Sequence, residues 1–271
     1  MHISVFFNHI VEASQQMGCS IEEVLKKVSS FGIDSVEFDM CEVPEPTKMY
    51  NHLLNAGLSV SSIYGFYDFG HNPKDNLGYE QVDKAIAMHA NKIMVIPGFL
   101  KGTTKKEREI EKQNMVKAVK QICEYADTHK IAVTIEDFDD KASPIATSDG
   151  MLWFATQIPA LKVTFDTGNF MYSCERELVA YDKLKSRIVH VHCKDRSTKK
   201  IEGEEPKANL EGTLMYSSPV GYGCIHMKEI IEKLKEMDYQ GTLTIEHFGS
   251  LNHIDYMEKS ANWIKSQIYK F

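Results

Sequence analysis

The stretch Val133-Thr134-Ile135-Glu136 follows a pattern that returns three more times along the chain. Each copy places an apolar, a polar and a second apolar residue before a carboxylate or an imidazole. The other copies are Val163-Thr164-Phe165-Asp166, Val189-His190-Val191-His192 and Leu243-Thr244-Ile245-Glu246. Because side chains alternate between the two faces of a β-strand, each copy puts its two polar residues on one face. We therefore expect four strands that end in ionisable side chains on a common face.

Short β-branched segments alternate with amphipathic segments along the whole chain. The predicted strands are Ile3–Phe7, Ile33–Phe38, Leu58–Ile63, Lys92–Ile96, Ala132–Glu136, Lys162–Asp166, Ile188–Cys193 and Thr242–Glu246. The predicted helices include one that begins at a capping box of Ser20 and Glu23, and the segments Lys105–His129, Ile225–Met237 and Asn252–Ile268. Strand–helix units of about 34 residues each predict an α/β fold, the (β/α)8 or TIM barrel.

The domain organisation follows from the absence of a break in this pattern. No linker or change in composition divides the 271 residues, so we expect one domain over residues 1–271. A doubly wound open sheet is the alternative, but no G-x-G-x-x-G turn follows the first predicted strand. The longest predicted irregular segment is Lys194–Gly223. A loop of that length inside a compact domain is usually functional or mobile.

Composition limits the classes of partner. The 31 Lys and Arg residues stand against 38 Asp and Glu residues, and the net charge of −7 argues against nucleic acid as a partner. No run of about 18 apolar residues is present, so we expect no membrane span. The first residues read as a strand rather than a signal peptide, and the cysteines form no C-x-x-C pair. We expect a cytoplasmic location.

The side chains at the ends of the last four predicted strands form the predicted site. In a (β/α)8 barrel the C-terminal strand ends surround the active site, so Glu136, Asp166, His192 and Glu246 should converge. Three neighbouring carboxylates call for a cation. Three oxygen ligands and one nitrogen favour one Mn²⁺ ion, with Mg²⁺, Co²⁺ and Zn²⁺ as alternatives. His190 competes with His192, but it lies further from the strand end and is expected one layer deeper.

Several longer motifs carry a resemblance to a known family. They are Phe31-Gly32-Ile33-Asp34-Ser35-Val36-Glu37, Ile135-Glu136-Asp137, Phe165-Asp166-Thr167-Gly168-Asn169, His190-Val191-His192-Cys193-Lys194-Asp195, Gly221-Tyr222-Gly223-Cys224-Ile225 and Ile245-Glu246. In order and spacing, over nearly the whole chain, they resemble the xylose-isomerase-like (β/α)8 barrels, the sugar phosphate isomerase/epimerase group. The resemblance implies that Glu136, Asp166, His192 and Glu246 hold one divalent metal ion.

The same resemblance implies a reaction. The metal would hold a carbonyl oxygen and a neighbouring hydroxyl of a sugar, a sugar phosphate or a keto-polyol. Glu246 or Glu136 would remove the proton from the carbon next to the carbonyl, and the other glutamate would return a proton to the enediolate. Return to the opposite face gives epimerisation, and return to the other carbon gives aldose–ketose isomerisation. The sequence leaves both reactions open.

Two positions depart from the family pattern. Asn169 stands where many relatives have a substrate-contacting His, and Thr198 stands where ketose 3-epimerase relatives have an Arg. An amide can form a hydrogen bond with a hydroxyl, but it cannot take up or release a proton near pH 7. Lys194 and Arg196 are the nearest cations and could either hold a phosphate or carboxylate or be solvated loop charges. The predicted substrate contacts are Asn169, His190, Lys194, Arg196, Glu37 and Asn8.

Other functions on the same fold are alternatives. A keto-inositol dehydratase would begin with the same proton removal, and a non-catalytic barrel would bind a sugar without converting it. An apurinic endonuclease would need further histidines, but the third and fourth predicted strands end in Ser62-Ile63-Tyr64 and Ile96-Pro97-Gly98. The last helix offers Trp263, Ile264 and Ile268 for packing or for a homo-oligomer.

Overall fold

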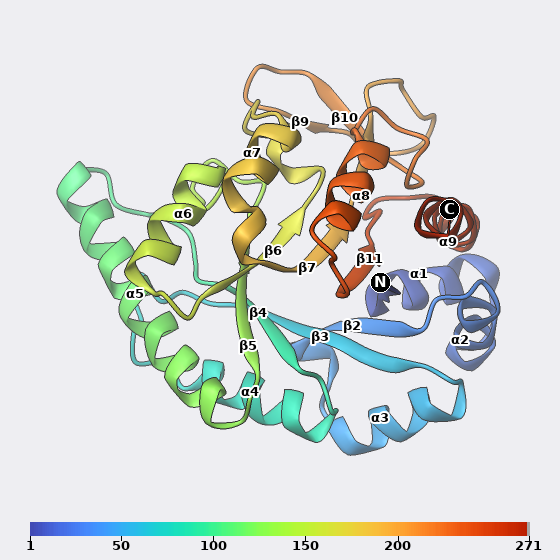
Figure 1. The fold of residues 1–271 in the computed structure, drawn as a ribbon, viewed down its shortest axis with the longest axis horizontal. Helices are drawn as coiled ribbons and strands as arrows, with labels where there is room; N and C mark the ends of the chain where they lie inside the picture. Colours follow the sequence, from blue (N-terminus) through green and yellow to red (C-terminus); the bar gives the residue numbers. More distant parts are fainter. Residues whose placement is uncertain (270–271) are drawn as a thin grey trace.

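The computed structural model describes residues 1–269, and within them eight parallel strands close into a barrel (Figure 1). The strands are β1 (His2–Phe6), β2 (Ser35–Asp39), β3 (Ser59–Phe66), β4 (Lys92–Ile96), β5 (Ala132–Glu136), β6 (Lys162–Asp166), β7 (Ile188–Cys193) and β11 (Thr242–Ile245). Each barrel strand lies beside the next one in the chain, and β11 closes the barrel against β1. The single-domain (β/α)8 barrel is confirmed, and the open sheet is excluded.

Helices cover the outside of the barrel (Figure 1). The α-helices of residues 1–269 are α1 (Phe7–Met17), α2 (Ile21–Ser30), α3 (Pro46–Asn55), α4 (Leu77–Ala87), α5 (Lys105–Thr128), α6 (Ser148–Gln157), α7 (Glu177–Leu184), α8 (Met227–Glu236) and α9 (His253–Ile268). The predicted capping box is confirmed, because Ser20 accepts the Glu23 amide hydrogen and Glu23 bonds back to Ser20. None of these described helices is long and apolar enough to cross a membrane.

The alternation predicted from the repeated stretches is present in the strands. Thr134 and Thr164 are buried inside the barrel, with their hydroxyl oxygens 2.7 Å apart. The apolar neighbours Val133 and Ile135 belong to the core between the strands and the helices. The register pairs Asp166 with His192 and Thr244 with His192. The ionisable residues of neighbouring strands therefore reach the same end of the barrel.

Some strand limits differ from the predicted ones. Phe7 is the first residue of α1 rather than the last of β1, and its ring stacks on Phe38 with the centroids 4.7 Å apart. β2 begins at Ser35 instead of Ile33. β3 continues to Phe66, because its pairing with β4 extends that far. These shifts do not change which end of the barrel carries the site.

The segment predicted to be irregular contains a small antiparallel sheet. Its central strand β10 (Leu214–Ser218) pairs with β8 (Asp195–Ser197) and with β9 (Lys207–Ala208). We call residues 195–218 the flap. Figure 1 shows β9 and β10 beyond the ends of β6 and β7, on the side to which these barrel strands point. The flap therefore covers the C-terminal end of the barrel.

The carboxylate of Asp195 ties the flap to the segment that leads into α8. It accepts the amide hydrogens of Gly221, Gly223 and Ile225 at 2.9, 2.9 and 3.1 Å. A Cβ atom on Gly223 would lie 2.1 Å from Oδ1 of Asp195. This close approach requires glycine, which gives the motif 221–225 a structural reason.

Candidate active site

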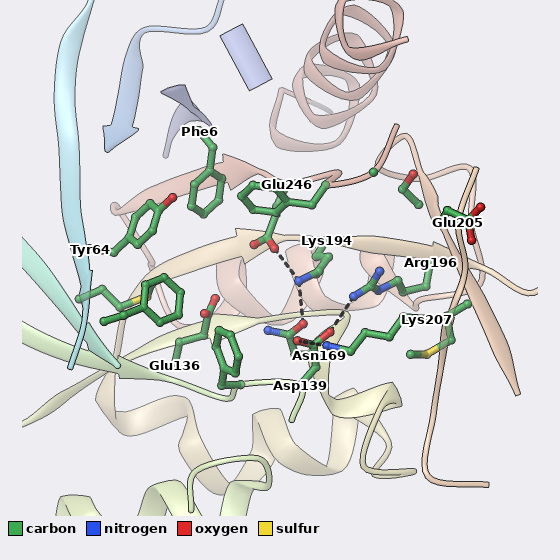
Figure 2. Close-up of a pocket in the computed structure, with 17 residues that line it drawn as sticks. Phe6, Tyr64, Glu136, Asp139, Asn169, Lys194, Arg196, Glu205, Lys207 and Glu246 are labelled. Atoms are coloured by element: carbon green, nitrogen blue, oxygen red, sulfur yellow. Dashed lines mark hydrogen bonds and ion pairs between the residues drawn. The ribbon is translucent and has the colours of Figure 1, made fainter. Parts of the chain in front are cut away.

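A pocket of about 450 Å³ lies at the C-terminal end of the barrel, beneath the flap (Figure 2). One wall is apolar and is formed by Phe6, Tyr64, Phe66, Met94, Phe138 and Phe248. The other side is polar and includes Glu136, Asp139, Asn169, Lys194, Arg196, Glu205, Lys207, Ser217 and Glu246. An apolar wall with a few converging polar groups is typical of a small-molecule site.

The structure brings together the four residues that the repeated stretches predicted. Glu136, Asp166, His192 and Glu246 are buried, and one ligand atom from each lies within 4.8 Å of the others. Nδ1 of His192 contacts Oε1 of Glu136 and lies 3.4 Å from Oε2 of Glu246. Each of these residues lies within one residue of the C-terminal end of its strand, so the barrel itself sets their positions.

The electrostatics of this group favour a cation. Burial raises the pKa of Glu136, and the nearby Glu246 raises it further. Burial also raises the pKa of Asp166 well above its ordinary value, with Glu246 and Glu136 adding to the shift. Oδ2 of Asp166 is buried and has no hydrogen-bond partner. Three carboxylates, one imidazole and an unpartnered carboxylate oxygen fit a divalent metal ion that prefers oxygen ligands.

Lys194 places its ammonium group against the same carboxylates. Nζ lies 2.5 Å from Oε1 of Glu246, 3.9 Å from Oδ2 of Asp166 and 2.7 Å from Oδ1 of Asn169 (Figure 2). Burial lowers the pKa of Lys194, but Glu246 and Asp166 outweigh that effect and raise it. The lysine predicted to contact substrate is therefore charged and faces the pocket beside the candidate ligands.

Asn169 is held by both of its polar ends. Its Nδ2 donates to the backbone oxygen of Asp137 at 2.8 Å, and its Oδ1 accepts from Lys194. Its amide N–H donates to Oδ1 of Asp166 at 2.7 Å. Asn169 thus lines the pocket in a fixed orientation that links Lys194 to the loop after β5.

Arg196 reaches the pocket from the flap and meets an acid that the sequence analysis missed. Its Nη2 lies 3.1 Å from Oδ2 of Asp139, and Nζ of Lys207 lies 2.8 Å from Oδ1 of the same carboxylate. Burial raises the pKa of Asp139, but Lys194, Lys207 and Arg196 together lower it. Nε of Arg196 is buried without a partner. No spacing pattern marks Asp139 or Lys207, because only the folded flap brings them together.

Three predicted substrate contacts do not line the pocket. The side chain of Asn8 is bonded to Glu42 and to the hydroxyl of Tyr64. Glu37 and His190 have no exposed surface and lie inside the barrel, with Nε2 of His190 2.7 Å from Oε2 of Glu37. The expected deeper position of His190 is thus what the structure shows. The side chains of these three residues are hydrogen-bonded to other protein groups and do not face the pocket.

Two of these buried groups have shifted pKa values. Burial lowers the pKa of His190 to about 4, so this imidazole is neutral near pH 7. Burial would raise the pKa of Glu37, but His190 and His192 lower it well below its ordinary value. A buried, ionised carboxylate therefore lies directly beneath the candidate metal ligands.

A second histidine cluster lies behind the apolar wall, and the sequence analysis did not identify it. His9 stacks on His247 with the ring centroids 4.3 Å apart, and Nδ1 of His247 lies 3.0 Å from Nδ1 of His253. Burial lowers the pKa of His9 and of His247. The rings of Phe6 and Phe248 separate this cluster from the pocket.

Comparisons with known proteins agree with this architecture. An inosose dehydratase from Clostridium beijerinckii is 33% identical over 109 residues, which are 38% of this chain and 37% of that protein. The match therefore spans little more than a third of that relative's length. A D-allulose 3-epimerase from Methylomonas sp. in complex with D-allulose is 15% identical, with a TM-score of 0.73 over 98% of this chain and 97% of that chain.

A further solved structure has the same fold with a metal. A xylose isomerase-like TIM barrel protein from Mycobacterium smegmatis, in complex with magnesium, is 18% identical, with a TM-score of 0.69 over 91% of this chain and 87% of that chain. The family model of the xylose isomerase-like TIM barrel matches residues 25–267. The chain therefore belongs to the xylose isomerase-like TIM barrel family.

Proposed function

We propose that the chain is a divalent-metal-dependent enzyme that moves a proton at the carbon next to a carbonyl of a sugar, sugar phosphate or keto-polyol. The observation that carries this proposal is the convergence of Glu136, Asp166, His192 and Glu246 in one buried group beside the pocket. Carboxylates and a neutral imidazole are the ligands expected for Mn²⁺, Mg²⁺ or Co²⁺, and Mn²⁺ is our first choice. The magnesium complex of a protein with the same fold supports a divalent ion.

The roles of the chain's own residues follow from their positions. A bound divalent ion supplies a Lewis acid that polarises the substrate carbonyl. Glu136 and Glu246 line the pocket from β5 and from the end of β11, two different sides of the cavity (Figure 2). One carboxylate removes the proton from the carbon next to the carbonyl, and the other returns a proton to the enediolate. The apolar wall of Phe6, Tyr64 and Phe66 excludes water from that carbon.

The polar side of the pocket would bind the rest of the substrate. Lys194 and Asn169 lie beside Glu246 and can hydrogen-bond substrate oxygens next to the reacting carbon. Arg196 is held by Asp139 and has an unpartnered Nε, so it can bind a hydroxyl, a carboxylate or a phosphate. Asn169 cannot take up a proton near pH 7, so the two glutamates carry the proton transfers.

Isomerisation or epimerisation is the reaction we propose first, since two carboxylates face one pocket and the D-allulose 3-epimerase has the same fold. Dehydration of a keto-polyol is the second candidate, because the inosose dehydratase from Clostridium beijerinckii matches part of the sequence. It begins with the same proton removal and ends with loss of a hydroxyl group as water. The proton removal is thus common to both candidates.

Exchange with heavy water tests the common step. The Mn²⁺-loaded chain is incubated in D₂O with ketoses, ketose phosphates and keto-inositols, and products are followed by NMR and mass spectrometry. We expect deuterium at the carbon next to the carbonyl of at least one substrate, with a new epimer or isomer, or with a product lighter by one water. Glu246→Gln should abolish it, with Glu202→Gln, an exposed flap residue, as the matched control. Binding of sugars without exchange would favour the non-catalytic barrel.

A further inference from the structure

The buried carboxylate of Glu37 is the feature that the proposed mechanism does not use. Glu37 lies in β2, where Val36 and Phe38 pack in the outer core and the side chain of Glu37 points into the barrel. It has no exposed surface and does not line the pocket. Because burying a charge is unfavourable unless it is paired, this carboxylate needs partners inside the barrel.

All of its polar contacts converge on one oxygen. Oε2 of Glu37 lies 2.7 Å from Nε2 of His190, 3.2 Å from Nε2 of His192 and 3.1 Å from the hydroxyl of Thr244. Oε1 is buried and has no partner. These partners come from β7 and β11, so Glu37 reaches through the barrel interior rather than to its neighbours in the sheet.

The two ring nitrogens of His192 face carboxylates on different sides, since Nε2 contacts Oε2 of Glu37 and Nδ1 faces the candidate metal ligands. A metal ion held by Glu136, Asp166 and Glu246 would take the lone pair of Nδ1. The imidazole would then keep its hydrogen on Nε2, where the carboxylate of Glu37 can accept it. Nδ1 is the atom that contacts Glu136 and lies 3.4 Å from Glu246, on the side of the candidate metal ligands.

We propose that Glu37 is a positioning residue for the metal centre: it fixes the ring and tautomer of His192 so that the Nδ1 lone pair faces the metal. This inference rests on the proposed function, since it needs a divalent ion at Glu136, Asp166, His192 and Glu246. A carboxylate on the far nitrogen of a metal-bound histidine orients the ring and strengthens the ligand. Glu37 therefore acts through His192 and not on the substrate.

Metal affinity of the full chain tests the proposal. We measure the dissociation constant for Mn²⁺ and Co²⁺ by competition with a chromophoric chelator, in the wild-type chain and in Glu37→Gln. The amide keeps the size of the side chain but can donate to Nε2, which would allow the hydrogen to move to Nδ1. We expect affinity to fall by about 10- to 100-fold, the range for lost support of a metal-bound histidine.

Thr244→Val is the matched control. It removes another hydrogen bond to the same Glu37 oxygen in the same interior, but it leaves the contact between Glu37 and His192. We expect its metal affinity to stay within about threefold of wild type, since the lost bond does not involve a metal ligand. An equal loss in both variants would show a general effect of interior packing and would overturn the proposal.

A measurement on the unmodified chain covers the case in which Glu37→Gln fails to fold. Long-range ¹H–¹⁵N correlation of the Zn²⁺-loaded wild-type chain, with His192→Gln for assignment, reports the protonation of each ring nitrogen. We expect hydrogen on Nε2 and a metal-bound Nδ1 for His192. The reverse assignment, or unchanged affinity in Glu37→Gln, overturns this inference alone. A wild-type chain that binds no divalent ion overturns the proposed function as well.

Discussion

Lys194 offers a sharp test of how charge is balanced at the site. Its side chain is 9% exposed, and its ammonium group lies 2.5 Å from Glu246. Lys194→Met keeps the apolar length of the side chain but removes the charge. Removing one partner of a buried ion pair typically costs about 3–5 kcal/mol, because the other charge stays buried without compensation. We therefore expect the metal-free chain to lose about that much of its free energy of unfolding.

The metal should reverse part of this loss. A divalent ion bound to Glu136, Asp166, His192 and Glu246 would compensate the carboxylates in place of the ammonium group. Only the hydrogen bond from the charged Lys194 to Asn169 would then be missing, and a hydrogen bond with a charged partner contributes about 1.5–3 kcal/mol. The difference between the variant and the wild type should therefore shrink to about 1.5–3 kcal/mol when saturating Mn²⁺ is present.

Urea unfolding followed by circular dichroism, with chelator and with Mn²⁺, measures both differences. Lys200→Met is the control, since Lys200 pairs with Glu202 at 2.9 Å and the two side chains are 71% and 90% exposed. Exposed pairs contribute about 0–1 kcal/mol, with or without metal. A Lys194→Met loss of the same size in chelator and in Mn²⁺ would refute the view that lysine and metal compensate the same carboxylates.

Three further outcomes are expected. Asp195→Asn should lower the free energy of unfolding in urea by about 3–6 kcal/mol, because the hydrogen bonds from the amides of Gly221 and Gly223 lose an anionic acceptor worth about 1.5–3 kcal/mol each. Amide hydrogen exchange in residues 195–225 should become faster. A loss of stability no larger than that of the exposed control Asp182→Asn would contradict this. Because burial lowers the pKa of His9, the unfolded chain binds its proton first as pH falls below about 6.5, and this histidine should lower the free energy of unfolding by up to about 1.4 kcal/mol per pH unit. The buried His190 and His247 add slopes of the same sign. His9→Gln should therefore reduce the slope between pH 7 and 5 by the share of His9, and an unchanged slope would refute it. A divalent ion at 100 times its dissociation constant should stabilise the wild-type chain by about 2.7 kcal/mol, and Asp166→Asn should lose this gain in the same urea titrations.

The barrel and the candidate ligands were predictable because both depend on local periodicity. The bounds of β5, β6 and β7 match the prediction residue for residue, since short buried strands with alternating faces leave a clear signal. The end of a barrel strand also fixes which end of the molecule its last side chain reaches. Glu136, Asp166 and His192 could therefore be placed before any contact was known.

Contacts made by long-range folding left no such signal. Asp139 joins the pocket only because the flap brings Arg196 and Lys207 to it. Lys194–Gly223 was predicted to be irregular because two of its strands, β8 and β9, are only three and two residues long and carry no apolar alternation. Glu37 was recognised as a strand-end acid, but its partners in β7 and β11 were beyond the reach of spacing arguments.

Asn169, which stands where many relatives have a histidine, is hydrogen-bonded to Lys194. The amide oxygen accepts from Lys194 while the amide nitrogen donates to Asp137, and an amide does both at any pH. A histidine here could take up a proton and would then repel the ammonium group of Lys194. A bound metal and Lys194 would compete for Glu246, so metal binding would leave the ammonium group held mainly by Asn169 and directed into the pocket. Asn169 and Lys194 therefore form one unit that holds a cation beside Glu246 in the pocket.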